Sequence, residues 1–156
     1  MNVRHDMVTV FVVRPGPRAR SHEFLQLRRA AGDLFGGTWQ IVRGGVEPDE
    51  TYVAAALREL REEAGLSPME FYRTGSVETF YIAQQDTIWH SVAFLALVPH
   101  DAAVTLNHEH DAHRWVPASR MDGQTMWASE RIILRELIRD LLDDGPGKPY
   151  LRVEVE

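Results

Sequence analysis

Stretches of apolar residues separated by polar turns predict a sheet that is covered by helices. The segment Met7–Val13 is almost entirely apolar and rich in valine, which is typical of a strand buried on both faces. Further strands are predicted at Glu23–Arg29, Trp39–Arg43, Phe71–Ile82, Ile88–Val98 and Arg114–Val116. Strands interspersed with helical segments indicate an α/β fold.

Two segments carry the spacing of an amphipathic helix. In Thr51–Ala64 the apolar residues recur every three or four positions, and Thr51 or Asp49 can cap the first turn. A later helix is predicted within Gly123–Asp144, where leucines and isoleucine follow the same spacing, and Gly145-Pro146 would end it.

Glycine-rich and polar segments predict the connections. Arg14–Pro17 reads as a turn, and Ala30–Thr38 contains three glycines and reads as a flexible loop. The polar residues Gln84–Thr87 are expected to join the two strands around them as a hairpin.

Three carboxylates gather on one side of the first predicted helix. At about 100° per residue, Glu59, Glu62 and Glu63 fall within roughly a 100° arc beside the apolar stripe. Like charges at this spacing are mutually destabilising, so folding alone gives no reason to collect them. Clustered carboxylates next to a glycine turn are the oxygen donors that Mg²⁺ or Mn²⁺ requires.

Composition limits the remaining classes of function. The chain has 156 residues, 44% of them hydrophobic, and no cysteine, so disulfide scaffolds, thiolate zinc sites and cysteine nucleophiles are excluded. One domain over residues 1–156 is expected. The net charge of −6 argues against a nucleic-acid polymer as a partner. No apolar run approaches the ~18 residues of a membrane span, and a cytoplasmic location without membrane contact is expected.

The helix and the turn before it resemble a known family motif. The pattern Gly44-x5-Glu50-x7-Arg58-Glu59-Leu60-x-Glu62-Glu63-x-Gly65-Leu66 is similar to the Nudix box of the MutT-like Nudix hydrolases, over residues 44–66. The resemblance implies a Nudix fold, which is an α/β/α sandwich around a mixed β-sheet. It also implies hydrolysis of a nucleoside diphosphate linked to another group.

The resemblance implies a role for each residue of the motif. Glu59, Glu62 and Glu63 are expected to bind Mg²⁺ or Mn²⁺, and Glu59 or Glu63 to help activate water. Arg58 is expected to orient these carboxylates rather than to touch the substrate, and Glu50 to belong to the same network.

The glycine turn before the helix is expected to approach the metal. Gly45 is expected to provide a carbonyl ligand, and Gly44 to let the backbone come close to substrate.

A second acidic residue lies in a histidine-rich segment. His108-Glu109 would begin a helical zinc signature, but Ala112 stands where that signature needs its second histidine. The Glu-His pair before Arg114-Trp115 resembles the loop that returns a further carboxylate to the metals in several Nudix hydrolases. Glu109 is therefore expected to be an additional ligand or base.

The substrate is expected to be a small nucleotide or pterin polyphosphate. The segment Trp39–Glu47 resembles dihydroneopterin triphosphate pyrophosphatases, which are also described as dATP pyrophosphohydrolases, and Arg43 replaces the proline of a related branch. Trp127–Arg131 also resembles them, whereas Pro48-Asp49 and the long Ala30–Gly37 loop depart from their pattern. We therefore expect hydrolysis of a dNTP or dihydroneopterin triphosphate with release of pyrophosphate.

Several residues are candidates for contact with that substrate. Arg28 and Arg43 are candidate phosphate contacts, Trp39 is a candidate for stacking on the base or pterin, and Ser129 is a further substrate-binding candidate. Tyr81 favours an alternative, a dinucleoside polyphosphate hydrolase, and ADP-ribose or nucleotide sugars belong to the same alternative. A further alternative is a non-catalytic Nudix module that binds nucleotides or regulates. The sequence also leaves open whether the chain forms a homodimer.

Overall fold

A seven-stranded sheet runs through the computed structural model, which describes residues 1–155. The strands are β1 (Asn2–Pro15), β2 (His22–Arg29), β3 (Trp39–Gln40), β4 (Val42–Gly45), β5 (Glu70–Ile82), β6 (Thr87–Leu97) and β7 (His110–Pro117). Their order is β3-β2-β1-β6-β5, with β4 pairing with β1 and β7 pairing with β2. Since β1 and β6 are parallel and the other pairs are antiparallel, the sheet is mixed.

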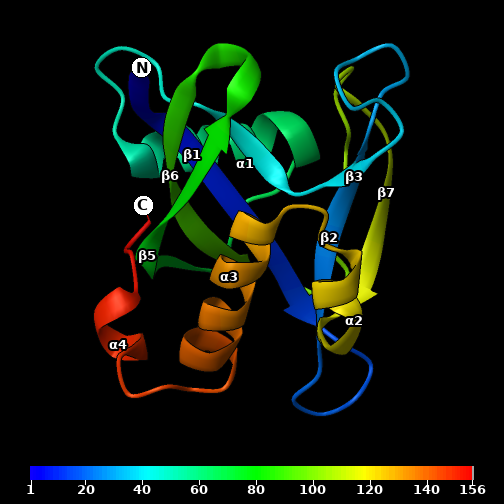
Figure 1. The fold of residues 1–156 in the computed structure, drawn as a ribbon. Helices are drawn as coiled ribbons and strands as arrows, with labels where there is room; N and C mark the ends of the chain where they lie inside the picture. Colours follow the sequence, from blue (N-terminus) through cyan, green and yellow to red (C-terminus); the bar gives the residue numbers. More distant parts are fainter. Residues whose placement is uncertain (156) are drawn as a thin grey trace.

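Helices cover both faces of this sheet. The helices are α1 (Tyr52–Ala64), α2 (Ala118–Gln124), α3 (Ala128–Leu137) and α4 (Lys148–Leu151), and a π-helical turn, Ile138–Leu142, continues α3. In Figure 1, α3 lies in front of the sheet and α1 behind it, while α2 lies beside the ends of β2 and β7. None of the helices within residues 1–155 combines the length and apolar character that crossing a membrane requires.

The central strand β1 belongs to two hydrophobic cores. Val8, Val10 and Val12 pack with the apolar stripe of α1. Phe11 and Val13 alternate with them and pack with the apolar residues of α3. The prediction of a strand buried on both faces is therefore confirmed, and the architecture is the α/β/α sandwich that the resemblance implied.

The structure corrects several predicted boundaries. Strand β1 extends beyond Met7–Val13 at both ends, and β7 begins at His110 rather than Arg114. The predicted strand Trp39–Arg43 is divided at Ile41, because its first part pairs with β2 and its second part with β1. Helix α2 was not predicted, because its short sequence carries no apolar stripe.

Candidate active site

Helix α1 places the three glutamates of the motif at different depths. The hydroxyl of Thr51 accepts a hydrogen bond from the first turn, and Gly65 ends the helix in the left-handed conformation. The side chain of Glu63 points to the sheet and is buried, that of Glu59 is mostly buried, and that of Glu62 is 55% exposed. The helix thus presents a row of carboxylates that runs from the core to solvent.

The guanidinium of Arg58 connects this row to the preceding turn. It donates to both carboxylate oxygens of Glu50 at 2.8 and 2.9 Å and to Glu59 at 2.8 Å. It also donates to Glu62 at 3.3 Å and to the carbonyl oxygen of Gly45 at 2.8 Å. Arg58 is therefore fully engaged by the motif itself and fixes the orientation of Glu59.

Burial and mutual repulsion determine how these carboxylates ionise. The Arg58 guanidinium holds the pKa of Glu50 at about 2. Burial raises the pKa of Glu59 despite the same guanidinium. Burial, followed by the charges of Glu59 and Glu109, raises the pKa of Glu63 to about 9. Ionisation of every carboxyl group in the cluster would therefore create more negative charge than its protein environment compensates.

Strand pairing brings the histidine-rich segment to the buried end of this row. Strand β7 runs beside β2, and the backbone N–H of Ala30 donates to the carbonyl oxygen of Glu109 at 2.9 Å. One ligand atom from each of Glu63, Glu109 and His110 lies within 4.8 Å of the other two. His108 and His113 are exposed, so the structure does not gather the three histidines into one site.

The donor set of this cluster fits a divalent cation. Carboxylate oxygens from α1 and from the segment before β7 converge. Arg58 pairs with Glu59 and Glu62, and within residues 1–155 no ion pair is formed by Glu63 or Glu109. A divalent ion would stabilise the ionised form of Glu63 against its burial and against the repulsion of Glu59 and Glu109, which together raise its pKa. The arrangement can therefore bind a metal with an attached polyphosphate.

The glycine turn of the motif contacts the side chains of α1. Gly44 and Gly45 end β4, and the carbonyl oxygen of Gly45 accepts the hydrogen bond from Arg58. One of the two lone pairs of this carbonyl is therefore used within the protein. Its expected part as a metal ligand would use the other.

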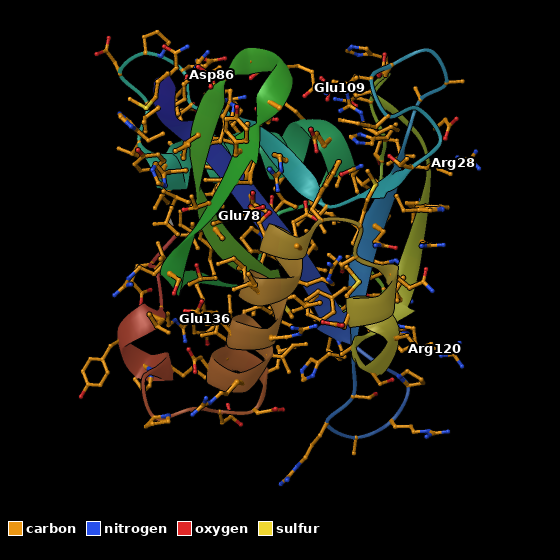
Figure 2. All side chains as sticks on the ribbon, viewed as in Figure 1. Arg28, Glu78, Asp86, Glu109, Arg120 and Glu136 are labelled. Atoms are coloured by element: carbon orange, nitrogen blue, oxygen red, sulfur yellow. The ribbon has the colours of Figure 1, made fainter. Side chains whose placement is uncertain are left out.

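Of the predicted substrate contacts, Arg28 and Trp39 lie together on the outer part of the sheet. Arg28 forms an ion pair with Asp111 at 2.6 Å, and both side chains are 42% exposed. The guanidinium carbons of Arg114 and Arg28 lie 4.2 and 5.8 Å from the centroid of the Trp39 ring. In Figure 2, Arg28 and Glu109 lie toward the same end of the molecule. Trp39 is thus a half-buried ring flanked by cations.

The structure corrects the expectation that Arg43 is available to a phosphate. Its Nη2 donates to both carboxylate oxygens of Glu78 at 2.8 and 3.0 Å and to Glu130 at 2.8 Å. The hydroxyl of Ser129 donates to the same Glu78 at 2.8 Å. Arg43 is committed to two buried carboxylates because its side chain points to the α3 side of the sheet. Only its backbone N–H, 3.4 Å from Glu63, faces the carboxylate cluster.

Glu78 is the centre of a polar network that the sequence did not reveal. Its side chain is fully buried and also accepts a hydrogen bond from Thr9 at 2.9 Å, and Thr9 contacts Ser91 at 2.8 Å. Figure 2 shows Glu78 beside the first turn of α3. An acidic residue in the interior of the predicted Phe71–Ile82 strand was the available signal, but only the strand register shows which partners face it.

Two aromatic rings meet at the loop that precedes Trp39. The ring centroids of Phe35 and Trp127 are 5.3 Å apart in an edge-to-face arrangement, and both side chains remain partly exposed. The loop that carries Phe35 begins at Ala30, whose backbone N–H donates to the carbonyl oxygen of Glu109. Tyr81 lies elsewhere, on the β5–β6 hairpin, where its hydroxyl donates to Asp86 at 3.1 Å.

Comparison with known proteins identifies the same motif. Residues 3–137 match the family model described as the NUDIX domain. The chain is 30% identical over 132 residues to the nucleoside triphosphatase NudI of Klebsiella pneumoniae, covering 80% of this chain and 94% of the relative. The family match over residues 3–137 therefore includes both α1 and the Glu109 segment.

Solved structures show the same architecture at lower identity. A Caenorhabditis elegans Ap4A hydrolase in a binary complex superposes with a TM-score of 0.72 at 23% identity, covering 90% of this chain and 98% of that one. The Escherichia coli dihydroneopterin triphosphate pyrophosphohydrolase superposes with a TM-score of 0.67 at 24% identity. This superposition covers 85% of this chain and 95% of that one. These similarities establish the fold, and the residues of the site must determine the substrate.

Proposed function

The chain belongs to the NUDIX domain family of hydrolases, and we propose that it cleaves a nucleoside triphosphate-like substrate, a dNTP or dihydroneopterin triphosphate, with release of pyrophosphate. The observation that carries the proposal is the convergence of Glu59, Glu63 and Glu109, whose charges oppose one another at the buried end of α1. Such a cluster is suited to the metal complex of a polyphosphate.

The metal-binding residues in this proposal are Glu59, Glu62, Glu63 and Glu109, with the carbonyl of Gly45 beside them. Mg²⁺ or Mn²⁺ bound there would neutralise phosphate charge and make the attacking water more acidic. The protein's contribution is to hold these oxygens in place, because phosphoryl chemistry depends mainly on alignment and charge stabilisation.

Arg58 and Glu59 have complementary parts in the proposed mechanism. Arg58 donates to Oε1 of Glu59 at 2.8 Å, and within residues 1–155 Oε2 of the same carboxylate accepts no hydrogen bond. This free oxygen is suited to accept the proton of the attacking water. Arg58 therefore acts by positioning, since its donors are used by the protein.

The substrate side of the proposal rests on aromatic rings and cations of β2, β3, β7, the loop before β3 and the residue before α3. Trp39, flanked by Arg28 and Arg114, and the ring pair Phe35–Trp127 offer stacking surfaces for a base or pterin. A relative named nucleoside triphosphatase supports the triphosphate class. Dinucleoside polyphosphates and ADP-ribose are the alternative, but the hydroxyl of Tyr81 is bonded within its hairpin and gives them no specific support.

The test is a substrate panel with identified products. Nucleoside and pterin triphosphates, dinucleoside polyphosphates and ADP-ribose would be incubated with the protein and either Mg²⁺ or Mn²⁺. Pyrophosphate and a monophosphate as products of a triphosphate, lost on adding a chelator, would support the proposal. A nucleotide pair or a ribose phosphate as the main product would favour the alternative, and turnover that survives the chelator would contradict the metal assignment.

A further inference from the structure

His110 is a buried histidine beside the carboxylate cluster, and one of its ring nitrogens has no hydrogen-bond partner within the described residues. His110 is the first residue of β7, and it is 5% exposed. Within residues 1–155, its Nδ1 atom is buried and has no hydrogen-bond partner. A buried nitrogen without a partner is costly to the folded state, so its presence needs a physical explanation.

The surroundings of His110 favour a ligand role for its imidazole. One of its ring nitrogens lies within 4.8 Å of carboxylate oxygens of both Glu63 and Glu109. These two residues come from different elements, α1 and the segment before β7, and His110 follows Glu109 directly. Two oxygens and one nitrogen therefore surround the same small volume, as they would around a single ion.

We propose that His110 supplies a nitrogen ligand to the ion that Glu63 and Glu109 bind, and that the site therefore prefers Mn²⁺ or Co²⁺ to Mg²⁺. This inference rests on the proposed function, because it concerns the same metal site. Imidazole is a good ligand for first-row transition ions, whereas Mg²⁺ prefers oxygen donors. Neutral imidazole nitrogen is one of the commonest protein ligands of transition metals.

The direct test is pulsed electron paramagnetic resonance of the Mn²⁺-loaded protein without any nucleotide. The wild-type protein should show the modulation of a directly bound nitrogen, and its frequency should change when histidine is labelled with ¹⁵N. His110→Asn should abolish the nitrogen signal. His108→Asn and His113→Asn, which alter exposed histidines of the same segment, should retain it.

A second measurement compares the affinities of Mn²⁺ and Mg²⁺ by calorimetry. His110→Asn should lower the affinity for Mn²⁺ by about 10-fold or more and change that for Mg²⁺ much less. An equal loss for both ions, or a nitrogen signal that persists in His110→Asn, would overturn the proposal. The absence of a nitrogen signal in the labelled wild type would also overturn it, and this result does not depend on whether any variant folds.

These outcomes are separate from those of the substrate panel. A nitrogen signal without triphosphate hydrolysis would refute the proposed substrate and retain the ligand. Hydrolysis without a nitrogen signal would retain the substrate and refute the role of His110.

Discussion

Gly44 lies against the carboxyl group of Glu59 with no space for a side chain between them. A Cβ atom at Gly44 would overlap the carboxyl carbon and both carboxylate oxygens of Glu59. Arg58 fixes the same carboxylate from the other direction at 2.8 Å. The close approach of the glycine backbone therefore sets the position of a proposed metal ligand.

We expect Gly44→Ala to displace Glu59 and to lower kcat/KM by about 10- to 100-fold, the loss typical of disturbing the support of a metal ligand. Circular dichroism should show an unchanged fold. Gly45→Ala is the matched variant, since its nearest neighbour, the Asp6 carbonyl oxygen, would lie 3.8 Å from the new Cβ. It should lose clearly less activity, and equal losses in the two variants would contradict the steric argument.

Glu63→Gln should remove most activity and yet stabilise the metal-free protein. The folded state holds a proton on Glu63 at neutral pH because burial raises its pKa to about 9, whereas the unfolded state releases it near the ordinary value of 4.5. Stability is therefore lost as the pH rises between these values, and glutamine avoids that loss. Thermal unfolding at pH 8 with a chelator should show a Tm increase of more than about 2 °C.

The comparison for this prediction is Glu62→Gln, which alters an exposed carboxylate of the same motif. It should also remove most turnover in Mg²⁺ but leave the metal-free Tm nearly unchanged. Should either variant retain wild-type kcat, the assignment of that residue as a ligand is wrong.

Glu109→Gln should lower kcat by about tenfold or more, because one carboxylate of the converging set is lost. The affinity for Mn²⁺ should fall in parallel, as measured by calorimetry without substrate. Asp101→Asn is a suitable control, since Asp101 is an exposed carboxylate of the segment that joins β6 to β7. Near-wild-type turnover of Glu109→Gln would refute its assignment.

Glu130 should make stability depend on pH. Burial raises its pKa from 4.5 to about 7, and Glu78 adds to this, while Arg43 and Arg131 oppose it. Because the single guanidinium of Arg43 pairs with both Glu78 and Glu130, the folded state retains a proton on Glu130 that the unfolded state releases. Stability is therefore lost as the pH rises from about 4.5 to about 7.

Glu130→Gln should lack this part of the pH dependence. Chemical unfolding of the two proteins should give similar free energies near pH 4.5 and a difference that grows by up to about 3 kcal/mol in favour of glutamine at pH 8. Parallel curves over this range would show that Arg43 compensates Glu130 completely.

Local signals made helix α1 predictable. Thr51, the apolar stripe and Gly65 define its ends and its buried face within one continuous segment. The side on which Arg43 would point was not predictable, because the strand around it is divided at Ile41 and only pairing with β1 fixes its orientation. His110 was equally hidden, since its burial depends on the pairing of β7 with β2.

Arg43 contacts the carboxylate cluster with its main chain and the α3 side of the sheet with its side chain. Its N–H lies 3.4 Å from Glu63, whereas its guanidinium reaches Glu78 and Glu130. A substitution at position 43 would change the second set of contacts and leave the amide in place for the first. The contacts of position 43 with its two acidic partners can therefore be altered while the proposed metal-binding carboxylates keep their backbone support.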